Sequence, residues 1–335
     1  MVTKENRLQV SKARLFINLG ILIGLSLFLA SQFGEARELV SLIVRAKYRW
    51  LLLALLIQVA TYIFDGAKWH ISIKPYGYGL KLRELGRMAL QQLSMNQFIP
   101  SVGMAGNAIV AREMLKLNIP GWIVAQSMSI DILSLLASYC AMAVVAIFLL
   151  YGIAPAWVIW FLVVFLFFFI IFTLAFWHFL YNHRRWRILN WFKRFKIVRQ
   201  TLSMMSQIPD GKVIPAQMFF KASVLRIAIF VLDGLTLWVL MIAIGSPATL
   251  TASFIALIAG SIGGIVSFLP AGIGGFEAAC AGILVLFGTP LGAALAGTLL
   301  LRGFVLWLPL IPGLIFLRKE IFPYELIGEN GLFVK

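Results

Sequence analysis

The sequence is poor in charged residues and in cysteine. Only 13% of its 335 residues are charged, whereas a soluble domain carries about 25%, and 61% are hydrophobic, so an ordinary soluble globular protein is excluded. The two cysteines, Cys140 and Cys280, lie in apolar stretches, which argues against a disulfide framework and leaves no CxxC metal motif. The three histidines, His70, His178 and His183, lack ligand spacing, so we expect no metal and no cofactor.

Motifs that carry soluble enzyme chemistry are also missing. The sequence contains no Walker A loop, GxSxG, HExxH or DxD, and its glycines lie in apolar helical stretches rather than in a strand–helix GxGxxG. It has no polar tract long enough for a separate soluble catalytic domain. We therefore expect the function to lie in the apolar body or its short loops, without ATP hydrolysis by this chain.

Hydrophobic runs of bilayer length are abundant. A membrane-crossing helix takes about 20 residues, and six segments meet this requirement: 15–33, 50–71, 121–150, 155–180, 214–244 and 290–317. The first follows a basic stretch, which suggests an uncleaved signal anchor, and residues 34–49 suit a helix at the membrane interface. The sequence predicts an all-α polytopic membrane protein.

We expect one integral membrane domain over residues 1–335. Within it we distinguish an anchor with its interfacial helix, a first repeat half, a basic loop, a second repeat half and a short tail: 1–49, 50–180, 181–213, 214–319 and 320–335.

Positive charge is concentrated between the apolar runs. Lys and Arg outnumber Asp and Glu by 29 to 13, a pattern that the positive-inside rule and anionic head groups explain better than nucleic acid. The most basic segment, 181–212, is either a loop that sets orientation or a surface helix that binds anionic lipid. With this loop in the cytoplasm, both termini are also cytoplasmic, and we expect a prokaryotic plasma (inner) membrane.

Two further apolar segments, 85–117 and 254–289, are interrupted by proline and glycine. The interruptions comprise Pro100, Gly103 and Gly106 in one segment and Pro270, Gly272, Gly274 and Gly275 in the other. A break in a lipid-facing helix leaves backbone groups without partners. We therefore expect each segment to be re-entrant, as two half-helices that meet inside the protein.

The two broken segments resemble each other. Phe98-Ile99-Pro100 matches Phe268-Leu269-Pro270, a polar residue follows seven positions after each proline, and a second proline follows 20 positions after the first (Asn107 and Pro120; Glu277 and Pro290). The charge topology orients the copies oppositely, which is typical of the inverted repeats of transporters. The alternative is that proline and glycine simply interrupt two unrelated membrane helices.

Ionisable residues are predicted at membrane depth. Asp131 lies 11 residues after Pro120, and Arg302 lies 12 residues after Pro290, so each reaches the middle of a core about 30 Å thick. An isolated charge there costs about 2.5–3.5 kcal/mol or more. A cross-repeat ion pair or a shared polar cavity would offset this cost, and the charges serve either structural pairing or a substrate or proton pathway.

Several of these residues resemble motifs of a known family. Pro100-x-x-Gly103, Ala111-Arg112 and the downstream Asp131 resemble the first motif of the lysylphosphatidylglycerol synthase transmembrane (flippase-like) family. Residues 268–277 (FLPAGIGGFE) with Leu301-Arg302 resemble its second motif. The resemblance implies a lipid-handling domain, which in bifunctional members moves aminoacylated phosphatidylglycerol to the outer leaflet. No aminoacyl-transferase domain is present in this sequence, so lysyl transfer is not implied, and Asn107 replaces a usual acidic residue.

These observations favour a flippase or translocase for an anionic, aminoacylated or polyprenyl-linked lipid. The expected substrate-binding residues are Arg112, Arg302, Asn107, Glu277 and Asp131. Arg112 and Arg302 would bind head-group phosphate, while Asp131 and Glu277 would pair with them or carry a proton. The alternatives are a membrane-embedded lipid-modifying enzyme and a non-catalytic scaffold for a separate synthase or glycosyltransferase. Anionic membrane lipids are the expected partners, and nucleic acid is not expected.

Overall fold

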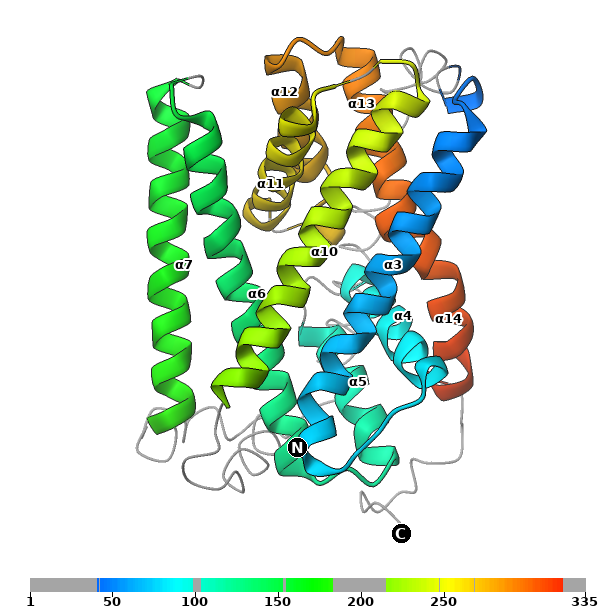
Figure 1. The fold of residues 1–335 in the computed structure, drawn as a ribbon, viewed down its shortest axis with the longest axis vertical. Coiled ribbons are helices and arrows are strands. Elements are labelled where there is room, and N and C mark those ends of the chain that lie inside the picture. Colours follow the sequence, from blue (N-terminus) through cyan, green and yellow to red (C-terminus); the bar gives the residue numbers. More distant parts are fainter. Residues whose placement is uncertain are drawn as a thin grey trace, which may run out of the picture.

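The computed structural model describes residues 41, 43–98, 104–152, 155–182, 215–246, 248–267 and 269–321, and within these ranges the regular structure is entirely helical (Figure 1). Five stretches are long and apolar enough to cross a membrane. They are α3 (Tyr48–Ile73), α6 (Gly121–Leu150), α7 (Ala156–Asn182), α10 (Ala216–Ala243), and the continuous run of α13 (Leu291–Arg302), η4 (Gly303–Trp307) and α14 (Leu308–Ile321). Five of the six predicted spans are thus confirmed. The predicted anchor 15–33, the basic loop after residue 182 and half of the predicted interfacial helix 34–49 lie outside the described residues.

Proline marks the start of three of these spans. Pro120, Pro215 and Pro290 are the N-cap residues of α6, α10 and α13. Proline lacks a backbone N–H, and the first N–H groups of a helix have no partner within the helix in any case. The prolines therefore cost no helical hydrogen bond, and they set where each span begins.

The two interrupted segments fold as helical hairpins. The first consists of α4 (Leu82–Phe98) and α5 (Met104–Lys116), and the second of α11 (Leu250–Val266) and α12 (Gly275–Leu286), joined through the short helix η3 (Pro270–Gly272). The hairpins enter from opposite ends of the molecule, and the inner ends of their helices lie near mid-height (Figure 1). The longest of these helices has 17 residues, or about 26 Å, and none alone spans the bilayer. This is the predicted re-entrant arrangement.

Glycine allows the two helices of each hairpin to pack closely. A Cβ at Gly106 would lie 2.5 Å from the backbone oxygen of Gln92, and a Cβ at Gly275 would collide with the backbone oxygen of Gly263. The second break also requires left-handed backbone, with φ of +66° at Gly272 and +84° at Gly274. Pro270 begins η3, whereas Pro100 and Gly103 lie outside the described residues.

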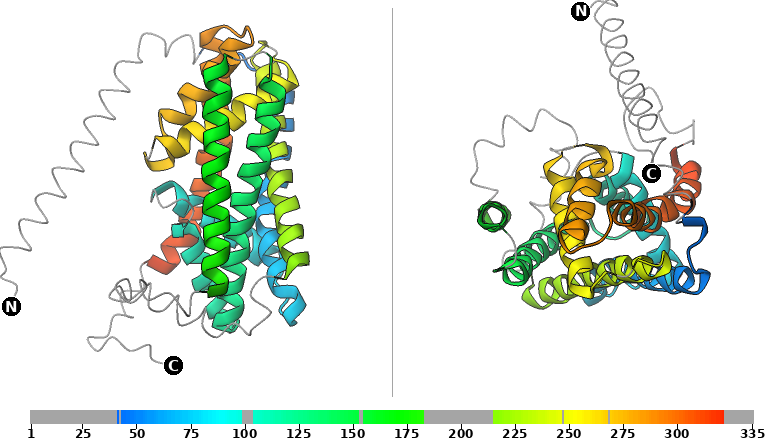
Figure 2. Two further views of the ribbon diagram at one scale, coloured as in Figure 1. Left: turned by 90° about the vertical axis from the view of Figure 1, so that its left-hand side faces the viewer. Right: turned by 90° about the horizontal axis from the view of Figure 1, so that it is seen from above.

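The two halves are related as an inverted repeat. Helix α3 runs from the upper to the lower end in Figure 1, and α10, which packs along it, runs the opposite way. The span that follows each hairpin packs on the hairpin of the other half: α14 on α4, and α6 on α11. In two perpendicular views these helices form one bundle, with α7 at its edge against α6 (Figure 2).

The repeat also includes a dipeptide that lies in the span before each hairpin. Asp65-Gly66 in α3 and Asp233-Gly234 in α10 are separated by nearly the same offset as the two break prolines. Each glycine faces the first helix of the hairpin that follows it, because a Cβ at Gly66 would meet Leu85 of α4 and one at Gly234 would meet Phe254 of α11. The correspondence therefore extends beyond the broken segments to the preceding spans.

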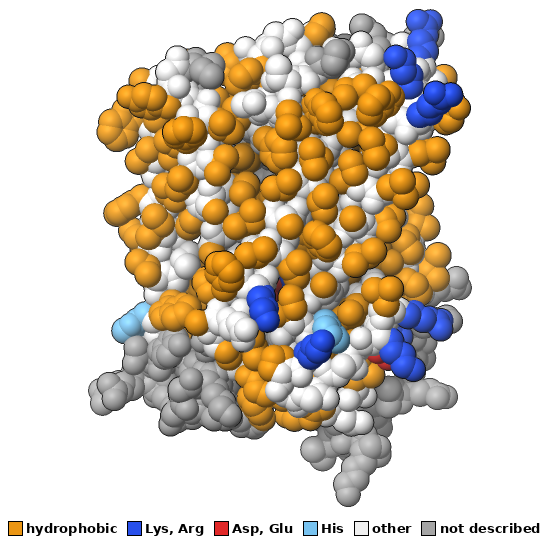
Figure 3. Space-filling view, in the orientation of Figure 1, with side chains coloured by type: hydrophobic (Ala, Val, Ile, Leu, Met, Phe, Trp, Pro, Cys, Tyr) orange, Lys and Arg blue, Asp and Glu red, His pale blue; other side chains and the backbone are white. Residues whose placement is uncertain are grey.

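The outer surface is that of a membrane protein. Large apolar side chains such as Phe148, Trp157 and Phe167 are exposed, and Figure 3 shows hydrophobic side chains over most of one face, with Lys and Arg confined to its upper corner and lower part. Three exposed basic residues next to the start of α3 (Arg45, Lys47 and Arg49) lie at the end away from the predicted cytoplasmic loop, contrary to the simple positive-inside count.

Candidate functional site: two ion-pair clusters at the helix breaks

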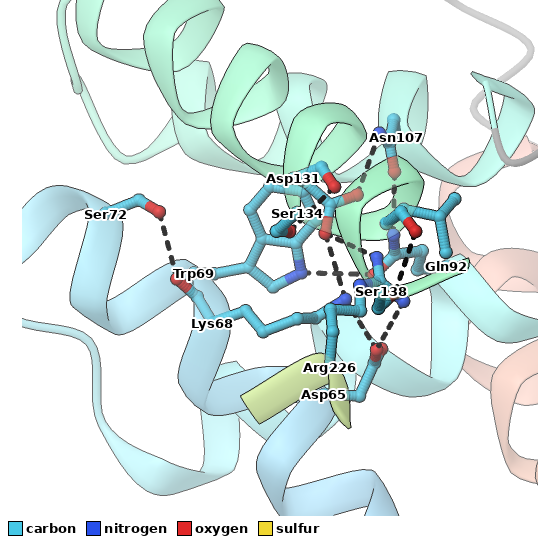
Figure 4. A network of polar contacts seen from close by, with 11 residues as sticks. Asp65, Lys68, Trp69, Ser72, Gln92, Asn107, Asp131, Ser134, Ser138 and Arg226 are labelled. Atoms are coloured by element: carbon cyan, nitrogen blue, oxygen red, sulfur yellow. Dashed lines mark hydrogen bonds and ion pairs between the residues drawn. The ribbon is translucent and has the colours of Figure 1, made fainter. Parts of the chain in front are cut away.

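The first cluster joins both halves of the protein around Asp131 (Figure 4). The Lys68 Nζ lies 3.0 Å from Oδ1 of Asp131 and 2.6 Å from Oδ1 of Asp65, one turn away on α3. Arg226 of α10 donates through Nη2 to the same Asp131 oxygen, and its Nη1 lies 3.7 Å from Oδ1 of Asp65. Two carboxylates and two cations thus balance at the centre of three helices.

This cluster is withdrawn from solvent. Lys68 is 1% exposed and Asp131 4% exposed. Removing a charge from water costs several kcal/mol, which an ion pair offsets only with good geometry and additional hydrogen bonds. The multiple contacts of Lys68, Asp131 and Arg226 meet this condition, and we infer that the cluster fixes how α3, α6 and α10 pack.

A chain of amides connects the first cluster to the first hairpin. Asn107 of α5 donates through Nδ2 to Oδ2 of Asp131 at 3.1 Å, and its Oδ1 accepts from Nε2 of Gln92 at 2.7 Å. The Oε1 of Gln92 accepts in turn from the indole N–H of Trp69 at 3.1 Å. The hairpin is therefore held against the ionic cluster through side chains with fixed donor and acceptor roles.

Some polar atoms of this region remain unused. Asp65 Oδ2, Arg226 Nε and both side-chain amide atoms of Gln91 are buried without a hydrogen-bond partner in the described part of the chain. Buried polar atoms are normally paired with protein or ordered water. Asp65 and Arg226 can accordingly engage water or a polar ligand in addition to each other.

The second cluster lies at the second break. Arg302 of α13 donates through Nε to Oε1 of Glu277 at 2.7 Å and through Nη2 to the carbonyl of Ala271 at 2.6 Å. The other carboxylate oxygen of Glu277 accepts from the backbone N–H of Gly274 at 2.7 Å. Arg302 is 7% exposed, and its guanidinium lies 4.7 Å from the centre of the Phe276 ring. Glu277 lies in the first turn of α12, where its carboxylate accepts a backbone N–H and is favoured by the helix dipole.

The two clusters occupy equivalent positions with different charge. In each half the polar residue after the break contacts the charged residue in the middle of the next span, as Asn107–Asp131 in the first half and Glu277–Arg302 in the second. The first half places a carboxylate in the span, and the second half places a guanidinium there. The charged residue of the span thus has the opposite sign in the two halves, and in each half it is compensated by ion pairs within its own cluster.

At the α3–α10 crossing, each helix contributes an equivalent residue that contacts the aspartate of the other helix. Gln58, seven residues before Asp65 on α3, donates through Nε2 to Oδ1 of Asp233 at 3.3 Å. Arg226, seven residues before Asp233 on α10, is the residue that contacts Asp65. Such an exchange of equivalent contacts is what a two-fold relationship generates.

The structure separates the predicted site residues into these clusters. Asn107 and Asp131 belong to the first, and Glu277 and Arg302 to the second. Of the alternatives left open for Asp131 and Arg302, an ion pair between the two does not form, because each is held by a nearer partner: Asp131 by Lys68 and Arg226, and Arg302 by Glu277. Arg112 is exposed on α5.

Sequence reasoning missed Asp65 and gave Lys68 no role in a site. The available signal was an acid and a base three residues apart inside an apolar run, a spacing that places them on one helix face. A group of three or more His, Cys, Asp or Glu side chains able to hold a metal is not found among the described residues.

The fold and its clusters define a class: a polytopic helical membrane protein with oppositely inserted broken hairpins and ionisable residues at their breaks. The family model for the lysylphosphatidylglycerol synthase TM region matches residues 15–313. The chain therefore belongs to this family, a lipid-related family of integral, multi-pass membrane proteins, as the sequence motifs predict. No curated protein matches the chain.

Proposed function

We propose that the protein is a flippase or translocase for an anionic, aminoacylated or polyprenyl-linked lipid of a prokaryotic plasma (inner) membrane. One observation carries the proposal: two half-membrane hairpins enter from opposite ends, and each break places ionisable groups near the bilayer centre. Broken helices of inverted repeats form the binding sites of many transporters. Family membership supports lipid as the class of substrate.

The cationic groups would bind the lipid head group. Arg302 offers a planar guanidinium that suits phosphate, and a phosphate would exchange with the carboxylate of Glu277, the present acceptor at 2.7 Å. Lys68 and Arg226 offer the corresponding cations in the first half, with Asp65 and Asp131 as the exchangeable acceptors. Exchange of this kind keeps each cation paired during the passage, and the displaced carboxylate of Glu277 would keep the backbone N–H of Gly274 as a donor.

The other expected residues act at the edges of this pathway. Arg112 is exposed on α5 and would attract an anionic head group before it enters. Asn107 would orient Asp131 through the amide chain to Gln92. Both termini would be cytoplasmic, and a separate synthase that supplies the lipid would be a partner.

A leaflet-resolved assay tests the proposal. The full chain is reconstituted into phosphatidylglycerol vesicles that contain a head-group-labelled phosphatidylglycerol, and the label left protected from an external quencher is followed. We expect protein-dependent loss of protection that Arg302→Ala abolishes. Arg83→Ala is the matched control, because Arg83 is an exposed arginine near the start of α4.

The assay also separates the alternatives. A lipid-modifying enzyme would change the mass of the lipids recovered from the vesicles, whereas a translocase would return them unchanged. A scaffold would show neither lipid movement nor modification and would co-purify with a synthase or glycosyltransferase. Lipid movement that is the same in the wild type and in Arg302→Ala would exclude Arg302 from the pathway.

A further inference from the structure

Asp233 differs from Asp65, Asp131 and Glu277, the carboxylates of the two clusters, because no cation among the described residues pairs with it. Asp65 and Asp131 contact Lys68 and Arg226, and Glu277 contacts Arg302. Among the described residues, the one hydrogen bond to the Asp233 side chain comes from the amide of Gln58, which donates at 3.3 Å. A charged carboxylate in this position would therefore lack a counterion.

The inverted repeat shows where the counterion is missing. Asp65 and Asp233 are equivalent, and each contacts the residue that lies seven positions before the other: Arg226 in one case and Gln58 in the other. The crossing thus contains one carboxylate–guanidinium contact and one carboxylate–amide contact in the same geometry. A neutral residue at position 58 removes the charge that would stabilise an ionised Asp233.

Among the described residues, the helices around Asp233 supply no other counterion for its carboxylate. Helix α11 carries no titratable residue, and the charged residue of α13, Arg302, is held by Glu277. On α6, Asp131 is paired, and the remaining titratable groups are Tyr139 and Cys140. On α3 and on α10 itself, the acidic and basic groups nearest in sequence to the crossing, Asp65, Lys68 and Arg226, are engaged in the first cluster.

The polar side chains that neighbour Asp233 are neutral. The Thr236 hydroxyl lies 3.3 Å from Oε1 of Gln58 and 2.9 Å from the carbonyl oxygen of Leu232, and the Gln58 side chain donates through Nε2 to Asp233. Tyr62, one turn after Gln58, donates to the carbonyl of Phe304 at 2.6 Å, within the π-helical turn η4. Such turns are frequent at functional sites. The neutral polar side chains thus extend from Asp233 to the span that carries Arg302.

Depth adds to the cost of a charge at this position. Asp233 lies 17 residues from the lower end of α10 and ten from its upper end, or about 26 Å and about 15 Å along the helix. A single carboxylate at such depth costs about 2.5–3.5 kcal/mol or more. Protonation removes the charge and leaves a carboxylic acid that the amide and hydroxyl groups can still accommodate.

We propose that Asp233 is a proton-binding site and that its protonation couples a proton gradient to the lipid movement proposed above. The coupling rests on the proposed function, whereas the proton site does not. Release of the proton creates an unpaired charge at the α3–α10 crossing, where the two halves meet. Binding of the proton to Asp233 and its release would therefore favour different arrangements of the two halves.

Infrared spectroscopy of the full chain in phosphatidylglycerol vesicles tests the site directly. We expect a carbonyl band of a protonated carboxyl group that disappears as the pH is raised. Asp233→Asn should remove it, Asp233→Glu should retain it at a shifted frequency, and Glu84→Gln, in the first turn of α4 at the outer end of the first hairpin, should leave it unchanged. Gln58→Arg copies the pairing of the first half and should remove the band while the carboxylate remains.

Absence of the band in the wild type, or its persistence in Asp233→Asn, would overturn the proton site. In the leaflet assay, an imposed pH gradient should stimulate the wild type and not Asp233→Asn; equal stimulation of both would overturn the coupling. A band that depends on Asp233, without lipid movement under any gradient, would support the proton site and defeat the proposed function. Lipid movement without a band that depends on Asp233 would support the proposed function and overturn the proton site.

Discussion

Asn107 donates to Asp131 at 3.1 Å and thereby connects the second helix of a re-entrant hairpin to the middle of the span that follows it. At the equivalent positions of the other half, Glu277 accepts from Arg302 at 2.7 Å. A neutral donor faces a carboxylate in one half, and a carboxylate faces a guanidinium in the other. The two halves thus share the contact between equivalent positions but differ in the charges of the residues that make it.

Asp131→Asn should destabilise the protein strongly. The substitution removes the carboxylate that Lys68 and Arg226 share, and removing one partner of a buried ion pair costs about 3–5 kcal/mol. We expect a lower unfolding temperature in detergent, measured by intrinsic tryptophan fluorescence. Glu84→Gln serves as a control for loss of an acid away from the cluster, and an unfolding temperature equal to that of wild type would contradict the role of Asp131.

Arg302→Lys should restore only a small part of the lipid movement lost in Arg302→Ala. Lysine keeps the charge, but it cannot reproduce the planar fork that reaches both Glu277 and the carbonyl of Ala271. The measurement is the initial rate in the leaflet assay at equal amounts of folded protein. A lysine variant as fast as wild type would show that charge alone suffices at this position.

Gly106→Ala and Gly86→Ala should have opposite effects. A Cβ at Gly106 would press against Gln92 and Asn96, whereas one at Gly86 meets nothing within 4 Å. We expect Gly106→Ala to lower the free energy of unfolding by about 1–3 kcal/mol through overpacking, and Gly86→Ala to raise it by up to about 1 kcal/mol through helix propensity. Denaturant titration in detergent measures both, and equal effects would contradict the close packing of the first hairpin.

Labelling of single cysteines should show both ends of each hairpin on one side of the membrane. In a background of Cys140→Ser and Cys280→Ser, Lys81→Cys and Leu117→Cys should react with a membrane-impermeant maleimide from the same side. Leu250→Cys and Leu291→Cys should react from the opposite side, because the second hairpin enters from the other end (Figure 1).

Sealed vesicles of known orientation give the sidedness of each label in that experiment. Reaction of Lys81→Cys and Leu117→Cys from opposite sides would mean that the first segment crosses the membrane. The same vesicles test the predicted cytoplasmic side, because the ends of the first hairpin lie at the end of the molecule to which α7 descends and from which α10 rises.

The sequence determined the elements of this protein and the depth of its main charges. Length and hydropathy alone located five of the described spans, since a helix that crosses hydrocarbon has a narrow range of lengths. The spacing after Pro120 and Pro290 was enough to place Asp131 and Arg302 inside the bilayer, because helical rise is constant. The prolines and glycines likewise indicated the two broken segments, and the short motifs indicated the family.

Only the tertiary structure decided which charges meet. Asp131 contacts Lys68 and Arg226, which lie 63 and 95 residues away in the chain, because the crossing and rotation of α3, α6 and α10 bring three faces together. Sequence spacing fixes the position of a residue along its own helix but not the direction in which that helix turns it toward its neighbours. For the same reason the partner of Arg302 and the unpaired state of Asp233 followed from packing rather than from composition.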